Sequence, residues 1–189
     1  MKRTDEPIDV VSARPEWMSQ AQTLRTEVCE ALGLTPARVE HIGSTAVPGL
    51  AAKPLIDLMV GCGENQRPAL AERLADLAGY EYLREFGAPG REYLRRRMAP
   101  PWSNVHVVEL DGQLWSDNLI FRDFLRSHPD AALEYADAKR SAAEQTGRLH
   151  AYSTAKSDTV RALLDRARCW SRSLASASCS DRTSRSSDM

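Results

Sequence analysis

One carboxylate interrupts a strongly apolar stretch of the chain. Residues 55–60 read Leu-Ile-Asp-Leu-Met-Val, the composition of a buried central strand, and Asp57 lies inside it. A lone ionised Asp in such a strand costs several kcal/mol unless another group pairs with it. Asp57 therefore either lies at the mouth of the strand and caps a neighbouring loop, or it serves a functional site.

Twelve residues separate a Gly-Ser turn from this carboxylate. Gly43 can bring backbone N–H groups close to a ligand because it has no Cβ, and the hydroxyl of Ser44 adds a further donor. Concave turns of this kind suit phosphate oxygens. Gly-Ser alone is a weak signal, but its combination with a carboxylate inside an apolar strand is more specific. Together they predict a phosphate-binding turn opposite a carboxylate that could bind a metal ion.

A longer match surrounds these two features. The turn and strand resemble the nucleotidyltransferase superfamily of the DNA polymerase β type. Residues 41–50 (His-Ile-Gly-Ser-Thr-Ala-Val-Pro-Gly-Leu) and 53–57 (Lys-Pro-Leu-Ile-Asp) are similar to the GrpB family, whose members have that fold. Similar modules follow a dephospho-CoA kinase domain in some actinobacterial proteins. Residues 105–109 and 121–126 agree with this family, and the resemblance covers roughly residues 17–170.

The resemblance and the residue pattern predict one α+β or α/β domain from residue 7 to residue 170. We expect a small mixed or antiparallel sheet of the nucleotidyltransferase type, flanking helices and a helical C-terminal part. Apolar residues at helical spacing predict helices that end at Gly33 and Gly79. Residues 91–98 and 104–110 suit adjacent antiparallel strands. The resemblance implies that Asp57 and His106 lie on neighbouring strands.

The last part of the chain has a different composition. Residues 171–189 contain eight serines and three arginines with almost no apolar side chains. Such a segment cannot offset its own ordering entropy. We therefore expect residues 171–189 to form a disordered tail.

The overall composition excludes several classes of partner. A net charge of −1 provides no long-range field for nucleic acid or an acidic membrane, so bulk nucleic-acid binding is not expected. The four cysteines form no C-x-x-C pair and are expected to be free thiols in a reducing cytosol. No stretch approaches the roughly eighteen apolar residues of a membrane span, and the N-terminus has no apolar signal region. We expect a cytoplasmic protein.

The family resemblance implies a role for several polar residues. Asp57 would hold Mg²⁺, and the turn would hold the β- and γ-phosphates of a nucleoside triphosphate. The residues of this turn are Gly43, Ser44 and Thr45. The candidate charge clamps are Lys53, Arg122, Lys139 and Lys156.

Some of these residues have a structural alternative. Tyr135 and Lys139 lie one helical turn apart and are neighbours on one face. They either contact the base and a phosphate, or the Tyr135 ring packs over the aliphatic part of the Lys139 side chain. Arg95, Arg96 and Arg97 alternate along a predicted strand. They lie either on a solvated surface or, for one or two of them, against the phosphates as bidentate donors.

The metal-binding pattern of the superfamily is incomplete in this sequence. The resemblance implies two acids separated by one residue on one strand and a third ligand on the neighbouring strand, and these positions read Asp57, Met59 and His106. Mg²⁺ prefers oxygen over imidazole or thioether, and two-metal transfer needs oxygen ligands for both ions. We expect Asp57 and His106 to be the catalytic residues and to hold at most one weakly bound Mg²⁺ or Mn²⁺.

Three functions remain open. The first is a nucleotidyltransferase with a degenerate metal site, which binds a nucleoside triphosphate and transfers a nucleotidyl group to an unknown small acceptor. The second is a module whose cleft holds a nucleotide or another phosphorylated metabolite without catalysis. The third is an interaction partner linked to coenzyme A metabolism. The number of carboxylates around Asp57 separates the first from the second, and small-anion binding separates both from the third.

Overall fold

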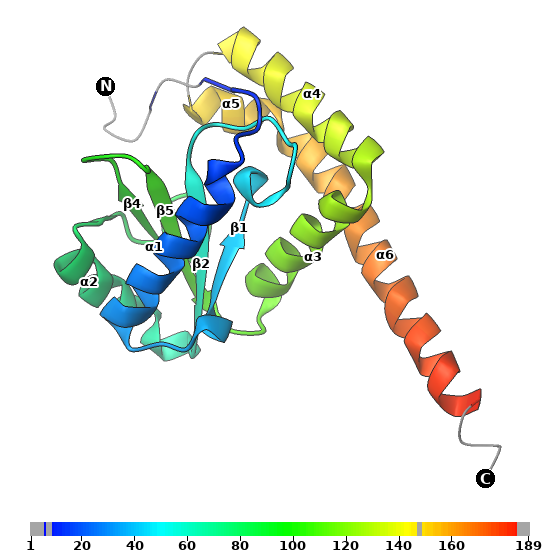
Figure 1. The fold of residues 1–189 in the computed structure, drawn as a ribbon, viewed down its shortest axis with the longest axis horizontal. Helices are drawn as coiled ribbons and strands as arrows, with labels where there is room; N and C mark the ends of the chain where they lie inside the picture. Colours follow the sequence, from blue (N-terminus) through cyan, green and yellow to red (C-terminus); the bar gives the residue numbers. More distant parts are fainter. Residues whose placement is uncertain (1–5, 7–8, 147–148, 185–189) are drawn as a thin grey trace.

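A five-stranded sheet forms the centre of the computed structural model, with helices on both of its faces (Figure 1). The structure describes residue 6 and residues 9–146 and 149–184. The strands are β1 (Val39–Ile42), β2 (Ile56–Cys62), β3 (Glu81–Tyr82), β4 (Glu92–Arg96) and β5 (Ser103–Glu109). The helices are α1 (Glu16–Leu32), α2 (Arg67–Ala78), α3 (Gln113–Ser127), α4 (Pro129–Thr146), α5 (Leu149–Ala155) and α6 (Ser157–Ser184). Short 3₁₀ turns are η1 (Pro36–Arg38), η2 (Ser44–Ala46) and η3 (Glu64–Gln66).

The sheet is mixed and has the spatial order β1-β2-β5-β4-β3. Strands β2 and β5 are parallel, whereas the other neighbouring pairs are antiparallel. The parallel register places Asp57 opposite Asn104, and Met59 opposite His106. The prediction that Asp57 and His106 lie on neighbouring strands is therefore confirmed, and so is the mixed α+β fold class.

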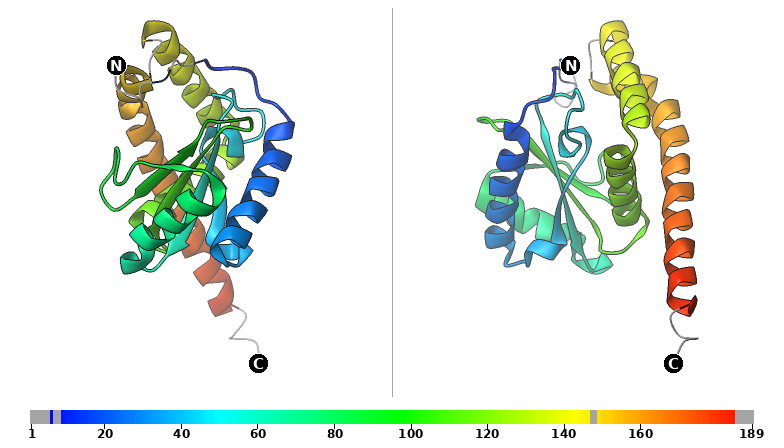
Figure 2. Two further views of the ribbon diagram at one scale, coloured as in Figure 1. Left: turned by 90° about the vertical axis from the view of Figure 1, so that its left-hand side faces the viewer. Right: turned by 45° about the vertical axis from the view of Figure 1, so that its right-hand side comes forward.

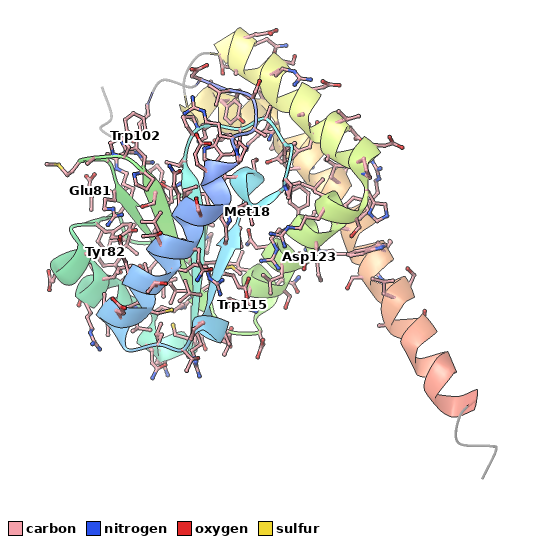
Figure 3. The ribbon with its side chains drawn as sticks, in the orientation of Figure 1. Met18, Glu81, Tyr82, Trp102, Trp115 and Asp123 are labelled. Atoms are coloured by element: carbon pink, nitrogen blue, oxygen red, sulfur yellow. The ribbon has the colours of Figure 1, made fainter. Side chains whose placement is uncertain are left out.

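The two faces of the sheet bury different side chains. On β2, Leu58 and Val60 face a core that includes residues of α1 and α2. Met59 points to the opposite face and packs in a cluster with Trp115 of α3, which is labelled in Figure 3. Because successive side chains of a strand point to opposite faces, Asp57 lies on the same face as Met59. Figure 2 shows α3 and α6 on this side of the sheet and α1 on the other.

The helices on the first face follow the predicted pattern. Helix α1 buries Trp17, Ala21 and Leu24 and ends at Gly33, whose φ of 63° lies in the left-handed region that glycine adopts without strain. Helix α2 ends in the same way at Gly79. Strands β4 and β5 pair antiparallel, as their sequences predict.

The C-terminal segment differs from the prediction. A disordered tail is expected from residue 171, but helix α6 continues through Ser184, and residues 185–189 lie outside the described part. The first half of α6 is held by packing, with Leu163 and Ala167 fully buried. Extending an existing helix costs far less than starting one, and alanine and arginine have high helix propensity. The helix therefore continues past its packed part, as Figure 1 shows.

The described cysteine side chains are unpaired. Cys29, Cys62 and Cys169 are free thiols, as the sequence predicts. Over the ranges that the structure describes, no helix combines the length and apolarity needed to cross a membrane.

Candidate functional site

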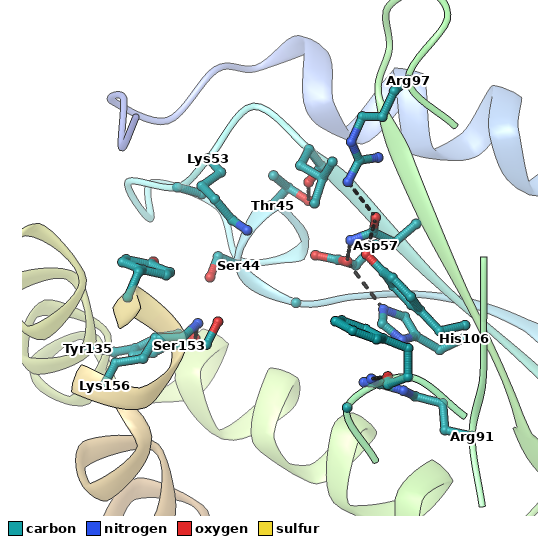
Figure 4. A pocket seen from close by; sticks show the side chains of 18 residues that line it. Ser44, Thr45, Lys53, Asp57, Arg91, Arg97, His106, Tyr135, Ser153 and Lys156 are labelled. Atoms are coloured by element: carbon teal, nitrogen blue, oxygen red, sulfur yellow. Dashed lines mark hydrogen bonds and ion pairs between the residues drawn. The ribbon is translucent and has the colours of Figure 1, made fainter. Parts of the chain in front are cut away.

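A cavity of about 450 Å³ lies between the Gly43 turn, the strands β2, β4 and β5, and the helices α4 and α5 (Figure 4). Most of the predicted site residues line it, namely Gly43, Ser44, Thr45, Lys53, Asp57, His106, Tyr135 and Lys156. The cavity also contains residues to which the sequence analysis gave no role, namely Phe86, Arg91, Tyr93, Asn104, Tyr152 and Ser153. Residues more than a hundred positions apart therefore share one site.

The turn after β1 lies directly against the carboxylate of Asp57. Gly43 has φ 73° and ψ −168°, and a Cβ added to it would lie 2.8 Å from Oδ2 of Asp57. Two hydrogen bonds of Thr45 fix the residues after Gly43. The Thr45 hydroxyl donates to the backbone oxygen of Leu55 at 3.2 Å and lies 3.0 Å from Nε2 of His41. Thr45 therefore anchors the turn to the segment before β2, and Nε2 of His41 must carry the proton that Thr45 accepts.

Asp57 is held by two partners on the neighbouring strand. Its Oδ1 accepts a hydrogen bond from Nδ2 of Asn104 at 2.6 Å and lies 3.3 Å from Nε2 of His106. Burial alone raises the pKa of this carboxyl, but His106, Lys53 and Asn104 together outweigh burial and hold it at about 2. Burial lowers the pKa of His106 despite the attraction of Asp57. The site thus pairs a carboxylate with a neutral imidazole whose Nε2–H donates to it.

Asn104 connects this pair to an arginine. Its Oδ1 accepts from the Tyr93 hydroxyl at 2.8 Å and from Nη2 of Arg97 at 2.9 Å. Of the three consecutive arginines, Arg97 lines the cavity, whereas Arg95 is buried in ion pairs with Glu81 and Glu6. Arg95 therefore does not lie on a solvated surface, and contact of Arg97 with phosphates stays a prediction.

Lysines and tyrosines alternate along the opposite wall. Nζ of Lys156 lies 4.9 Å from the ring centre of Tyr152 and 3.5 Å from the Tyr135 hydroxyl, and Nζ of Lys53 lies 5.7 Å from the Tyr152 ring centre. Cations over aromatic faces are attracted by the ring quadrupole. The rings hold the two ammonium groups at the cavity wall without neutralising their charge.

Two predicted clamp residues lie outside the cavity lining. Lys139 is fully buried beneath Tyr135, 4.5 Å from its ring centre, and donates to the backbone oxygen of Ala51. Arg122 forms ion pairs with Glu40 at 2.7 Å and with Asp123 at 2.8 Å. Its donors are used to join α3 to β1, so the structure gives Arg122 a scaffold position.

The residues around Asp57 do not fit a two-metal centre. Met59, which occupies the position of the second acid, is fully buried with Ile42, Val108 and Trp115. Within the described ranges, no three His, Cys, Asp or Glu side chains gather closely enough to hold a metal ion. Asp57 is thus the one carboxylate that lines the cavity in the described chain.

The buried amine of Lys139 should make stability depend on pH above neutrality. Burial, followed by the positive charge of Lys156, lowers the pKa of Lys139 from 10.5 to about 7. Between about pH 7 and pH 10 the unfolded chain therefore binds more protons than the folded one, so the free energy of unfolding rises with pH. This group contributes a slope of at most about 1.4 kcal/mol per pH unit. Denaturant unfolding across this range should show the slope in the wild type and a smaller slope in Lys139→Met.

The control for this measurement is an exposed cation. Arg161 lies on the surface of α6 and pairs with Asp158. The Arg161→Gln variant should keep the pH dependence of the wild type. Parallel curves for the wild type and Lys139→Met would contradict a neutral, buried Lys139 amine.

Comparison with known sequences identifies relatives along most of the chain. The family model described as GrpB protein matches residues 7–166. A UPF0157 protein of Pseudomonas aeruginosa is 37% identical over 175 residues, which cover 86% of this chain and 69% of the relative. A dephospho-CoA kinase of Mycolicibacterium paratuberculosis is 32% identical over 87% of this chain and 47% of the kinase. The chain therefore spans about half the length of that kinase.

Comparison with solved structures agrees with this result. The crystal structure of the conserved protein GrpB from Enterococcus faecalis matches with a TM-score of 0.74 and 32% identity, over 86% of this chain and 99% of that chain. The structure of the GLD-2/RNP-8 complex matches with a TM-score of 0.52 and 15% identity, over 77% and 58%. The second likeness concerns the fold alone. The chain thus belongs to the GrpB family and has its nucleotidyltransferase-like fold.

Proposed function

We propose that the cavity binds a nucleoside triphosphate. The observation that carries this proposal is the convergence of Lys53 and Lys156 on a cavity that is also lined by Gly43 and Ser44. Among the described lining residues, Asp57 is the single acid, so cations are in excess. A volume of about 450 Å³ lies within the range of small-molecule sites. Phosphate oxygens would find charge-assisted donors on one wall.

Aromatic side chains supply the other half of a nucleotide site. Tyr93 and Phe86 stack with ring centres 6.1 Å apart, and both line the cavity. Tyr152 on the opposite wall is buried beneath Lys53 and Lys156, so its ring is not available to a base. Every base has a face that stacks on such rings, so this lining favours a nucleotide without selecting one base.

Nucleotidyl transfer to a small acceptor is the catalytic extension of this proposal. The hydrogen-bonded pair of Asp57 and His106 in the cavity favours it. The single carboxylate opposes it, because the oxygen ligands of any Mg²⁺ or Mn²⁺ would have to come mostly from the triphosphate. We expect at most one weakly held ion, and transfer that is slow or absent.

The similarity to a dephospho-CoA kinase supports an alternative. The same cavity could hold a phosphorylated metabolite, or the chain could serve as an interaction partner of coenzyme A metabolism. Thermal unfolding with the common nucleoside triphosphates, with coenzyme A and with sodium chloride at matched ionic strength separates these possibilities. At a ligand concentration a hundredfold above the dissociation constant, a bound nucleotide stabilises the fold by about 2.7 kcal/mol. If no nucleoside triphosphate exceeds the salt control, the proposal is wrong.

Replacement of Asp57 by asparagine should change the affinity for ATP in opposite directions with and without a metal ion. Without metal, ATP should bind about tenfold more tightly, because a partly buried negative charge next to the phosphates is removed. With Mg²⁺ or Mn²⁺, the added affinity that the ion provides in the wild type should be lost. Calorimetric titration of ATP with a chelator and with each ion measures both effects.

A surface acid provides the control. Asp158 lies at the exposed start of α6, so Asp158→Asn should leave both titrations unchanged. An Asp57→Asn variant that keeps the full metal-dependent gain would show that the ion binds without this carboxylate.

A further inference from the structure

Arg91 is a partly buried cation of the cavity that the proposed triphosphate site does not use. Its Nη2 donates to the Phe86 oxygen at 2.6 Å, and its guanidinium carbon lies 5.3 Å from the ring centre of Tyr93. Its Nε is buried without a hydrogen-bond partner. The described side chains place no carboxylate in an ion pair with it. A guanidinium with unused donors in a cavity is stabilised by any group that brings oxygens to it.

The position of Arg91 separates it from the lysines. Figure 4 shows Lys53 and Lys156 on one side of Asp57, and Arg91 on the other side, beyond His106. A carboxylate between two cationic regions disfavours an anion at the centre and leaves one favourable region on each side. The cavity therefore has two separate places where an oxyanion is stabilised.

We infer that Arg91 forms a second oxyanion subsite, which takes the carboxylate or phosphate group of a small molecule that meets the nucleotide at Asp57 and His106. The planar guanidinium suits bidentate contact with either group. The Tyr93 ring lies beside the guanidinium and belongs to this subsite, so a nucleotide base would stack on Phe86. The acceptor class is thus an anionic small molecule. This assignment rests on the proposed function for the identity of the first ligand.

The same chemistry could come from the nucleotide itself, if its phosphate chain reached Arg91. Thermal unfolding with inorganic phosphate separates the two sources, with sodium chloride at matched ionic strength as the reference and with or without saturating ATP. In the wild type, phosphate should raise the unfolding temperature even when ATP is bound, because the Arg91 subsite stays open.

The Arg91→Gln variant tests the residue directly. With ATP bound, the phosphate concentration that gives half of the temperature increase should rise about tenfold, while ATP affinity stays unchanged. Arg91→Lys keeps the charge and should show a smaller rise, and it replaces the first variant if that one does not fold. Arg84→Gln removes an exposed cation that pairs with Glu72, so it should match the wild type.

Two results would overturn the inference. One is a phosphate response in Arg91→Gln equal to that of the wild type. The other is a loss of ATP affinity in Arg91→Gln, since Arg91 would then hold the phosphates of the nucleotide. If ATP does not stabilise the wild type, the proposed nucleotide function fails. The Arg91 subsite is then tested without ATP. Phosphate should still raise the unfolding temperature of the wild type more than that of Arg91→Gln.

Discussion

Replacement of Gly43 by alanine should lower the free energy of unfolding by about 3 kcal/mol or more. Two costs add in this variant. The backbone at Gly43, with φ 73° and ψ −168°, is in a region that is essentially restricted to glycine. The new Cβ would also lie 2.8 Å from Oδ2 of Asp57, so the carboxylate must leave its hydrogen bonds or the turn must move. Denaturant unfolding measures the loss.

A second glycine separates the two costs. Gly33 also has a positive φ of 63°, but a Cβ there meets nothing within 4 Å. Gly33→Ala should therefore cost only about 1 kcal/mol. Adding Asp57→Ala to Gly43→Ala should recover part of the larger loss. Equal losses for Gly33→Ala and Gly43→Ala would contradict the close contact between the turn and the carboxylate.

Replacement of both Lys53 and Lys156 by glutamine should weaken ATP binding about hundredfold. Each ammonium group faces the cavity, and a charge-assisted hydrogen bond to phosphate contributes about 1.5 kcal/mol or more, which is about tenfold in affinity. Both ammonium groups contact one phosphate chain, so the losses of binding free energy in the two single variants should add in the double variant. Calorimetric titration of the single and double variants measures the effect.

The matched control is Lys139, a lysine beside this wall that does not face the cavity. Lys139 contacts the Tyr135 ring, as Lys156 does, but it is buried and does not line the cavity. Lys139→Gln should change stability and leave ATP affinity near that of the wild type. Undiminished affinity in the Lys53 and Lys156 double variant would place the phosphates elsewhere.

Local patterns were enough to predict much of the scaffold. The ends of α1 and α2 follow from Gly33 and Gly79, because glycine adopts the left-handed conformation that closes a helix. The neighbouring positions of Asp57 and His106 came from the family resemblance, since period-two alternation alone does not say which strands pair. Helix α6 extends further than predicted because an existing helix propagates through residues that would not start one.

The site was only partly predictable because its contacts join distant residues. Asn104 lies two residues before His106, so strand alternation places both on one face, but its bond to Asp57 depends on the parallel register of β2 and β5. One partner of Arg122 is Glu40, which lies on β1. Helical spacing identifies neighbours on one helix, and it does not show which charges another element satisfies.

The central claim is that a nucleoside triphosphate occupies the cavity between the Gly43 turn and helices α4 and α5. The most direct test is a titration of isotopically labelled protein with ATP, followed by the backbone amide chemical shifts. The largest changes are expected at Ser44, Thr45 and Ser153, which line this cavity. Changes centred on Leu133, in the separate cavity beside α4, or on Trp102, in the cavity near the N-terminal segment, would contradict the claim.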